Sequence, residues 1–429
     1  MHTSIEELYS FFLKHSTIST DSRRVVPGCL FFALKGDNFD GNKYAKVALD
    51  AGAAFAVIDD PIFDGSQTLL VNDVLEALQI LAQMHRRKFS IPVIAITGSN
   101  GKTTTKELIN AVLSRQYEVT ATKGNLNNHI GVPLTLLEIT NKTQIAIIEM
   151  GANHQGEIAQ LCTIAEPTHG LITNIGKAHL GGFGGYEGVI KAKSEMYTWL
   201  RNSGGEVFAN GDNPMLTELS SGINRTLYGK HEGSSCRGQA RENNGILGID
   251  WISGNNTISV DTNLVGIYNF ENVMAAICLG TFFDIPPQLI KSAISSYTPS
   301  NSRSQALKTE RNSIILDAYN ANPTSMQVAI ENFRQVNVPH KMVILGDMLE
   351  LGDESYAEHL AIANLVDESG FEKVILVGSD FKKVAGERFT SFITSGEAFE
   401  YLCKQQLKDF TILVKGSRGI KMEKVLEAL

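Results

Sequence analysis

The segment Ile91–Lys106, with the sequence IPVIAITGSNGKTTTK, combines an apolar run, a glycine-rich turn and a lysine. Its first part, Ile91–Ile96, is short, rich in β-branched residues and free of charge, which predicts a buried parallel strand. Gly98 and Gly101 bracket the turn, and Lys102 opens a predicted helix. Backbone amides at a helix start, together with a lysine and an adjacent hydroxyl, form a site for phosphate and magnesium. The segment therefore predicts a site for a nucleoside triphosphate.

The spacing of this turn is narrower than that of the general phosphate loop, which has four residues between its first glycine and the GK pair. Here only Ser99 and Asn100 separate Gly98 from Gly101. The alternative is an ordinary glycine turn that contains a lysine, but the order of strand, turn and helix favours the phosphate site. The residues predicted to bind the nucleotide through this loop are Gly98, Ser99, Asn100, Gly101, Lys102, Thr103 and Thr104.

Length and composition indicate a multidomain enzyme of ordinary globular type. A chain of 429 residues exceeds what one hydrophobic core usually supports, so two or three domains are expected. The balance of 38 basic and 46 acidic residues argues against a general nucleic-acid or membrane-surface binder. No apolar run approaches the ~20 residues needed to span a bilayer.

The five cysteines are odd in number, widely scattered and without a C-x-x-C pair. This usage indicates a reducing compartment and no thiolate metal site. The first residues show no basic region followed by an apolar core, so no signal peptide is expected. We therefore expect a cytoplasmic protein, acting as a monomer on small molecules, without nucleic-acid partners.

The order of apolar runs predicts an α/β fold of three domains. Residues 1–84 hold three short strand candidates and form a small mixed α/β domain. Residues 85–297 alternate strands with helices, as in a central phosphate-loop ATPase domain with a parallel sheet, and a polar stretch at 229–256 predicts hairpins or loops. Residues 298–429 predict a second doubly wound, Rossmann-like domain, with a linker at 298–304.

The predicted helix 186–200 contains two lysines with different surroundings. At about 100° per residue, Lys193 falls about 40° from Val189 and within the apolar face, whereas Lys191 falls near 200° and outside it. A lysine on an inward face is costly unless it is paired or chemically altered. The alternative is a side chain whose stem packs inside while its ammonium reaches water.

Several further segments resemble one family, the Mur ligases, and the similarity covers essentially the whole chain. The general features are GSNGKTT (98–104), GNLNNHIGVPL (124–134), EMGAN (149–153), NIGKAHL (174–180), KAKSE (191–195) and GIYNFEN (266–272). Subgroup features are DAYNANPTSM (317–326), LGDMLELGDES (345–355) and VKGSRGIKME (414–423). Tyr268 departs from the pattern, since many members carry histidine there. The family makes the peptide of bacterial cell-wall precursors, which supports cell shape and cell division.

The resemblance implies ATP-dependent amide-bond formation with magnesium. ATP would activate the carboxylate of UDP-N-acetylmuramoyl-tripeptide as an acyl phosphate, which the amine of D-alanyl-D-alanine would then attack. Lys102 would pair with the phosphates. Thr103, Glu149, His179 and a carbamylated Lys193 would bind magnesium. Glu149 also ends a buried strand, where sites of α/β proteins lie, whereas His179 alone reads as a structural histidine.

The same resemblance assigns roles to the three predicted domains. Residues 1–84 would bind the UDP sugar, 85–297 would bind ATP, and 298–429 would bind the dipeptide and close on ATP. The residues matched to ATP binding are Asn272, Arg303 and Asp317, and those matched to the substrates are Ser22, Arg23, Lys35, Asn125, Asn128, Asp347, Lys415 and Arg418. From sequence alone these positions also suit a helix N-cap, a solvated linker arginine and charged turns.

A dipeptide carries one ammonium and one carboxylate, so its site requires an acid and a base. The candidates are Asp347, Glu350, Lys415, Ser417 and Arg418, expected on exposed loops at strand ends, and the sequence leaves open which residue does which. Two other functions stay open as well. One is a Mur or folylpolyglutamate-type ligase that adds a single amino acid, and the other is a nucleotide-binding relative without catalysis.

Overall fold

The computed structural model describes residues 2–243, 245–299 and 303–429, so that part of the predicted linker lies outside the described residues. The chain divides into two compact units. The first comprises the chain up to Ile96 together with Tyr117–Ala152 and Gly156–Gly170, and the second comprises Thr97–Gln116, Asn153–Gln155 and Leu171–Leu429. No helix in the described ranges has the length and apolarity needed to cross a membrane.

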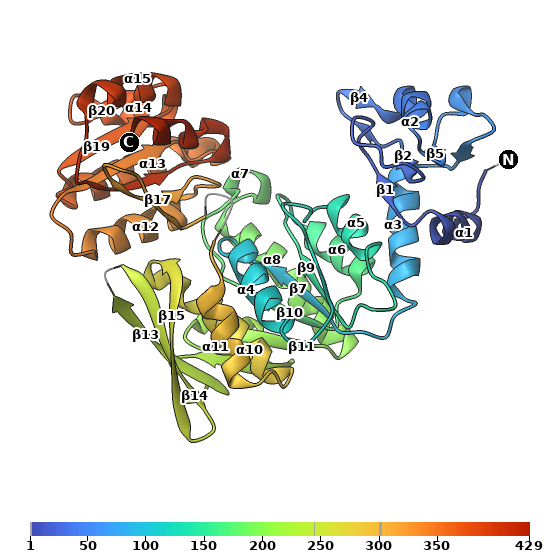
Figure 1. The fold of residues 1–429 in the computed structure, drawn as a ribbon, viewed down its shortest axis with the longest axis horizontal. Coiled ribbons are helices and arrows are strands. Elements are labelled where there is room, and N and C mark those ends of the chain that lie inside the picture. Colours follow the sequence, from blue (N-terminus) through green and yellow to red (C-terminus); the bar gives the residue numbers. More distant parts are fainter. Residues whose placement is uncertain (1, 244, 300–302) are drawn as a thin grey trace. The chain divides into compact units, whose positions relative to one another are not determined.

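The first unit begins with a small α/β domain (Figure 1). Its sheet contains β1, β2, β5 and β6, which are neighbours in this order and are all parallel. Its core contains Phe31, Ala48 and Ile58. The elements of this part are α1 (Ile5–Lys14), β1 (Ile18–Ser19), β2 (Leu30–Phe32), β3 (Lys35–Gly36), β4 (Phe39–Asp40), α2 (Ala45–Asp50), β5 (Phe55–Ile58), β6 (Thr68–Leu70) and α3 (Val74–Arg86). The three predicted strands are therefore present.

The rest of the first unit holds parallel strands, and one of them, β9, ends at the predicted site residue Glu149. Strand β9 pairs with β7 on one side and with β8 on the other. All residues of β7 and β9 are buried, as the uncharged β-branched runs predict. The elements are β7 (Val93–Thr97), β8 (Val119–Ala121), α5 (Gly131–Leu136), β9 (Ile145–Glu149), α6 (Glu157–Ala165) and the start of β10 (His169–Ile172).

The second unit contains parallel strands that pass into an antiparallel ribbon. Strands β11 and β12 are parallel, whereas β13, β14 and β15 pair antiparallel, so the predicted hairpins at 229–256 are present. The elements are α4 (Lys102–Leu113), α7 (Leu180–Phe183), α8 (Tyr186–Ser203), β11 (Glu206–Asn210), α9 (Pro214–Leu219), β12 (Asn224–Gly229), β13 (Cys236–Asn243), β14 (Ile246–Ser253), β15 (Asn256–Val265), α10 (Phe270–Phe282) and α11 (Pro287–Ser296).

The C-terminal part of the second unit has a six-stranded sheet in the order β16-β17-β21-β18-β19-β20, parallel except for β16. One core joins the sheet to α12, α13 and α14, and another joins it to α15 and the C-terminus. The elements are β16 (Gln305–Lys308), β17 (Ser313–Asp317), α12 (Pro323–Gln335), β18 (Lys341–Gly346), α13 (Ser355–Glu368), β19 (Lys373–Val377), α14 (Ser379–Ala385), β20 (Thr390–Phe392), α15 (Ser395–Gln405) and β21 (Thr411–Lys415). This is the predicted doubly wound arrangement.

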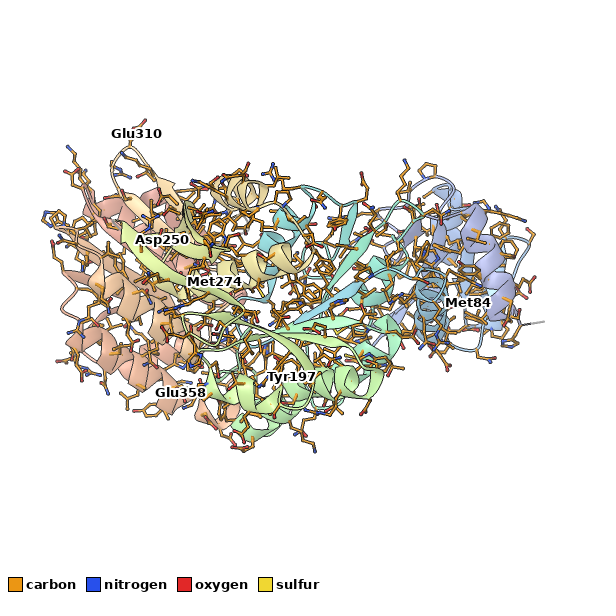
Figure 2. The ribbon with its side chains drawn as sticks, turned by 90° about the horizontal axis from the view of Figure 1, so that it is seen from below. Met84, Tyr197, Asp250, Met274, Glu310 and Glu358 are labelled. Carbon is orange, nitrogen blue, oxygen red and sulfur yellow. The ribbon has the colours of Figure 1, made fainter. Side chains whose placement is uncertain are left out.

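Helix α8 confirms the predicted difference between its two lysines. Lys193 is 2% exposed, whereas Lys191 lies on the exposed side of the helix. The Lys193 ammonium lies 5.2 Å from the centre of the Phe183 ring. A side chain whose ammonium reaches water is therefore excluded. Tyr197, also on this helix, is fully buried but was not predicted to be so (Figure 2).

Candidate active site

The loop after β7 has the conformation that its glycines allow. Gly98 has φ +141° and Gly101 has φ +78°, values that residues with a Cβ rarely adopt. A Cβ at Gly98 would lie 2.0 Å from Thr173 Oγ1, and one at Gly101 would lie 2.6 Å from Asn272 Oδ1. Both positions therefore need glycine for conformation and for space.

The loop is also fixed by side chains that the sequence analysis did not assign. Asn174 Oδ1 accepts the N–H of Asn100 at 3.0 Å, and Asn174 Nδ2 donates to the Asn100 carbonyl at 3.1 Å. Thr173 Oγ1 donates to the same carbonyl at 2.6 Å. The Ser99 hydroxyl donates to the Gly176 carbonyl at 3.0 Å. In the segment NIGKAHL, only His179 was predicted as a site residue. The bonds of Asn174 and Gly176 show that this segment also holds the phosphate loop in place.

Helix α4 begins at Lys102, as predicted. The Lys102 ammonium donates hydrogen bonds to the carbonyls of Gly98 and Ser99, at 2.7 and 3.3 Å. Thr103 and Thr104 are buried in the first turn. Since the amides of a helix start carry partial positive charge, this end of α4 favours an anion.

Asn272 lies on α10, but its side chain bonds to α4 and does not cap α10. Its Oδ1 accepts a hydrogen bond from Thr105 Oγ1 at 3.0 Å, and its Nδ2 donates to Asn269 Oδ1 at 2.9 Å. Asn269 in turn donates to the Val265 carbonyl at 2.8 Å. Asn269 is the N-cap residue of α10 but makes no side-chain cap, and Asn272 lies inside that helix, so the N-cap alternative is wrong for Asn272. Tyr268 donates to or accepts from Ser304 Oγ at 2.8 Å, and burial raises the pKa of its hydroxyl.

In the first unit, Glu149 ends β9 with its carboxylate buried. Asn127 donates to Glu149 Oε1 at 2.8 Å. Asn127 was not among the predicted site residues, although it lies in the same polar turn as the predicted Asn125 and Asn128. Asn125 is exposed, and Asn128 Oδ1 accepts the N–H groups of Ile130 and Gly131, so it supports the start of α5.

The predicted sugar-binding residues form ion pairs on the surface of the first unit. Arg23 pairs with Asp21 through two hydrogen bonds, which lower the pKa of Asp21 to about 2. Lys35 pairs with the buried Asp59 at 2.7 Å. Burial raises the pKa of Asp59, but the hydrogen bonds from Lys35 and Asn42 outweigh it and lower the pKa overall. Ser22 lies half-buried beside Arg23.

Asp317 and Lys415, predicted on separate strands for separate ligands, form one ion pair. Lys415 Nζ lies 2.5 Å from Asp317 Oδ2, across the parallel pairing of β17 and β21. Lys415 is 1% exposed, so the expectation that it lies on an exposed loop is wrong. Arg303 stacks on Tyr319, with its Cζ 3.7 Å from the ring centre.

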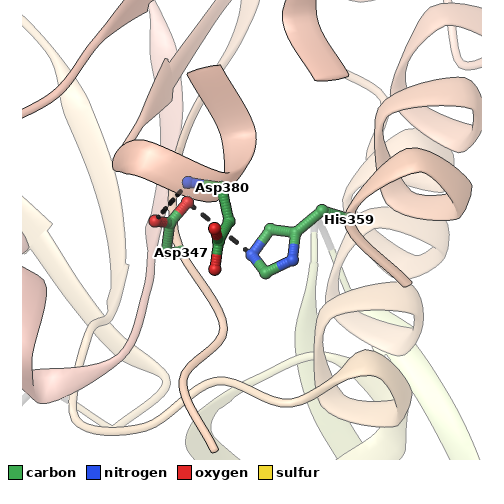
Figure 3. Close-up of side chains that lie close together, drawn as sticks. All are labelled: Asp347, His359 and Asp380. Atoms are coloured by element: carbon green, nitrogen blue, oxygen red, sulfur yellow. Dashed lines mark hydrogen bonds and ion pairs between the residues drawn. The ribbon is translucent and has the colours of Figure 1, made fainter. Parts of the chain in front are cut away.

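Asp347 is also buried, contrary to the expectation of an exposed acid. Its carboxylate accepts the N–H groups of Asp380 and Phe381 at 2.9 and 2.8 Å, at the start of α14 (Figure 3). His359 Nε2 accepts the N–H of Met348 at 3.0 Å, and its Nδ1 lies 2.7 Å from the Ser355 carbonyl. These bonds fix the orientation of the imidazole ring.

The side chains of Asp347, His359 and Asp380 lie close enough together to hold a cation. Their polar atoms are already engaged with backbone groups and with Ser355. We therefore read this group as a support for the loop after β18. Ser417, the fourth candidate of this region, is buried as well, and its hydroxyl accepts the N–H of Leu349 at 3.0 Å.

His179 and Glu350 are in direct contact through Nδ1 and Oε2. The hydrogen bond from His179 lowers the pKa of the Glu350 carboxyl. Nearby, Lys177 pairs with Glu358 at 2.6 Å. The loop that carries His179 is thus bonded to residues that follow β18.

These features define the class of protein. Family models match three successive segments: the Mur ligase family catalytic domain at residues 14–86, the Mur ligase middle domain at 96–280, and the Mur ligase glutamate ligase domain at 302–418. The chain belongs to the Mur ligase family. The predicted α/β class and the resemblance are confirmed.

Similar proteins point to one branch of the family. The chain is 35% identical to the UDP-N-acetylmuramoyl-tripeptide–D-alanyl-D-alanine ligase of Bacillus subtilis strain 168, over 96% of this chain and 92% of that protein. The ligase of the same name from Escherichia coli K12 is also 35% identical, over 96% and 93%. Crystal structure I of MurF from Acinetobacter baumannii has a TM-score of 0.88 at 30% identity and covers 99% of this chain and 98% of that one. The Thermotoga maritima MurF ligase in complex with ADP has a TM-score of 0.86 at 26% identity, over 97% of both chains.

Proposed function

We propose that this chain is the ATP-dependent ligase that adds D-alanyl-D-alanine to UDP-N-acetylmuramoyl-tripeptide in peptidoglycan precursor synthesis. The observation that carries the proposal is the phosphate loop. Gly98 and Gly101 have no room for a Cβ, and the N–H and the carbonyl of Asn100 are both hydrogen-bonded. A loop fixed in this way would present the start of α4 to a phosphate. The near full-length similarity to ligases of that name supports the choice of substrates.

In this proposal, the residues around the loop bind ATP. The amides of Ser99 to Thr104 and the Lys102 ammonium would hold the phosphates. Arg303, stacked on Tyr319, would approach them from the C-terminal part, and Asp317 and Asn272 would also bind ATP. The tripeptide carboxylate would become an acyl phosphate, and attack by the dipeptide amine would then release phosphate.

The oxygen-bearing side chains proposed for magnesium would offer ligands that suit the ion. Glu149 offers a buried carboxylate oriented by Asn127, and Thr103 offers a buried hydroxyl at the helix start. Hard oxygen ligands of this kind suit magnesium. When bound, the ion would neutralise phosphate charge during transfer. His179 and Lys193, the latter as a carbamate with carboxylate-like oxygens, would complete the set.

Three further expectations belong to the proposal. Residues 1–84 would bind the UDP sugar, residues 85–297 would bind ATP, and residues 298–429 would bind the dipeptide. The residues proposed to bind the sugar-peptide substrate are Ser22, Arg23, Lys35, Asn125 and Asn128. The chain would act as a monomer. It would work in the cytoplasm, in keeping with five free cysteines, four of them buried.

The experiment that tests the function is phosphate release from ATP in the presence of UDP-N-acetylmuramoyl-tripeptide. D-alanyl-D-alanine is either present or replaced by single amino acids, and the product is weighed by mass spectrometry. We expect release that requires the dipeptide, with a product heavier by that dipeptide. Release with a single amino acid would instead assign another branch of the family, and no release despite ATP binding would favour a non-catalytic relative.

A further inference from the structure

Glu350 and His179 share an unusual backbone conformation as well as their contact. Glu350 has φ +68° and His179 has φ +53°, in the left-handed region that residues with side chains rarely adopt. Strained backbone conformations of this kind cluster at functional sites. The neighbouring backbones also approach closely, because a Cβ at Gly352 would lie 3.6 Å from Gly181 Cα.

The loop that carries Glu350 is held firmly, while the Glu350 carboxylate contacts His179 through Oε2 and is otherwise exposed. Asp347, Met348 and Leu349 are each fixed by a hydrogen bond to another element. The Glu350 side chain is nevertheless 61% exposed. A fixed backbone that presents an exposed acid is the arrangement that a receptor for a small cation requires.

A base lies on the segment bonded to this loop. The Leu349 N–H is donated to Ser417 Oγ at 3.0 Å, and a Cβ at Gly419 would lie 2.8 Å from Leu349 Cδ1. Arg418 lies in the sequence between Ser417 and Gly419, which make these two contacts. It is exposed, and its Cζ lies 5.3 Å from the centre of the Tyr319 ring. An exposed acid and an exposed base therefore lie on two loops that touch.

The other C-terminal candidates, Asp347, Lys415 and Ser417, are buried. Asp347 caps α14, and Lys415 is buried against Asp317. Of the five residues considered for the dipeptide, Glu350 and Arg418 are the two that present exposed charge. A zwitterionic dipeptide requires one of each sign.

We propose that Glu350 binds the ammonium group of the incoming D-alanyl-D-alanine and that Arg418 binds its carboxylate. The assignment rests on the proposed function. It places the amine beside His179, on the segment whose Asn174 and Gly176 are hydrogen-bonded to the phosphate loop. A planar guanidinium binds a carboxylate through two parallel hydrogen bonds, which favours arginine for that end.

The test separates the two ends of the dipeptide. Phosphate release is measured at saturating ATP and UDP-N-acetylmuramoyl-tripeptide while either D-alanyl-D-alanine or D-alanyl-D-alanine amide is varied. The amide keeps the ammonium and lacks the carboxylate. The variants are Glu350→Gln, Glu350→Asp and Arg418→Gln, with Glu387→Gln, an exposed acid of the same sheet region, as the matched control.

We expect Glu350→Gln to raise KM for both acceptors about tenfold or more, since a hydrogen bond to a charged group contributes about 1.5–3 kcal/mol. Glu350→Asp keeps the charge and should raise KM less. Arg418→Gln should raise KM for the dipeptide by a similar factor and leave KM for the amide within about twofold of the wild-type value. KM for ATP should stay unchanged in each variant.

Three results would overturn the assignment. Unchanged acceptor KM in Glu350→Gln would remove Glu350 from the site, and a raised KM for ATP and magnesium instead would make it a metal ligand. If Arg418→Gln raised KM for D-alanyl-D-alanine and KM for its amide by the same factor, Arg418 would not bind the carboxylate. If wild-type protein used a single amino acid in place of the dipeptide, the proposed function would fail, but the same Glu350 variants with that amino acid would still test ammonium binding.

Discussion

Asn322 Nδ2 donates a hydrogen bond to Asn100 Oδ1 at 2.7 Å, which joins the start of α12 to the phosphate loop. The same asparagine caps α12, because its Oδ1 accepts the N–H of Ser325 at 2.9 Å and the Ser325 hydroxyl completes a capping box. One side chain therefore serves helix stability and the position of the loop at once. Substitutions can separate these two roles.

Asn322→Ser should keep the helix cap and lose the bond to Asn100, since serine is a good N-cap but has a shorter side chain. We expect little change in thermal stability and a fall of about two- to tenfold in kcat/KM for ATP. Asn322→Ala should show the same kinetic loss and a further destabilisation of about 1 kcal/mol. A serine variant with wild-type kinetics would show that the contact does not serve the reaction.

Gly98→Ala should abolish tight nucleotide binding. The added Cβ would lie 2.0 Å from Thr173 Oγ1, and φ +141° would be strained as well. Gly204→Ala is the matched control, because φ is +73° there and nothing lies within 4 Å of the added atom. We expect the control to lose about 1 kcal/mol of stability and to keep its affinity for ATP. Equilibrium binding of ATP and thermal unfolding measure the two effects; equal affinities of the two variants would contradict the steric argument.

The Asp317–Lys415 pair predicts a stability effect that must be separated from any effect on catalysis. Asp317→Asn leaves the buried Lys415 ammonium without its carboxylate, which should cost about 3 kcal/mol. The double variant Asp317→Asn with Lys415→Met removes both charges and should recover much of that loss. Urea unfolding followed by circular dichroism measures both. If the single and double variants proved equally stable, the loss in Asp317→Asn would not come from the unpaired charge of Lys415.

Periodicity and strand composition were sufficient to predict much of this fold. Buried parallel strands follow from uncharged β-branched runs, and the inward position of Lys193 follows from the helical repeat alone. In the same way, the position of Lys102 at the start of α4 follows from the glycines before it.

What the sequence could not predict depends on partners that are distant along the chain. Asp347 and Lys415 stand at strand ends, where charged residues are usually exposed. They are buried because α14 supplies amides to one and β17 supplies a carboxylate to the other. Asn127 was overlooked for the same reason, since its role exists only where the polar turn meets the end of β9.

His85 should make the stability of the first unit depend on pH. Burial lowers the pKa of its imidazole, and Nε2 lies 2.8 Å from the Ile139 carbonyl while Nδ1 lies 3.1 Å from the Tyr9 hydroxyl. The unfolded chain therefore binds a proton near the usual pKa of about 6.5 before the folded chain does. The stabilisation is present above that pH and is lost as the pH falls toward the folded pKa.

The measurement compares wild type with His85→Gln and, as an exposed control, His129→Gln, by thermal unfolding at pH 7.5 and 5.5. Wild type and the control should lose more stability on acidification than His85→Gln. Equal losses in all three would show that burial of His85 does not couple folding to pH.

Lys193 offers the most direct test of the proposed magnesium ligands. It is buried on α8 and was predicted there as a lysine that must be paired or altered. If a carbamate on Lys193 supplies carboxylate oxygens, Lys193→Ala should lose most activity and regain part of it when a short-chain carboxylic acid is added. Lys191→Ala, on the exposed side of the same helix, should keep its activity and show no response to the acid. Mass spectrometry would not decide the matter, because carbamates are lost in acid, whereas a Lys193→Ala variant that no acid rescues would argue for a lysine that acts through its charge.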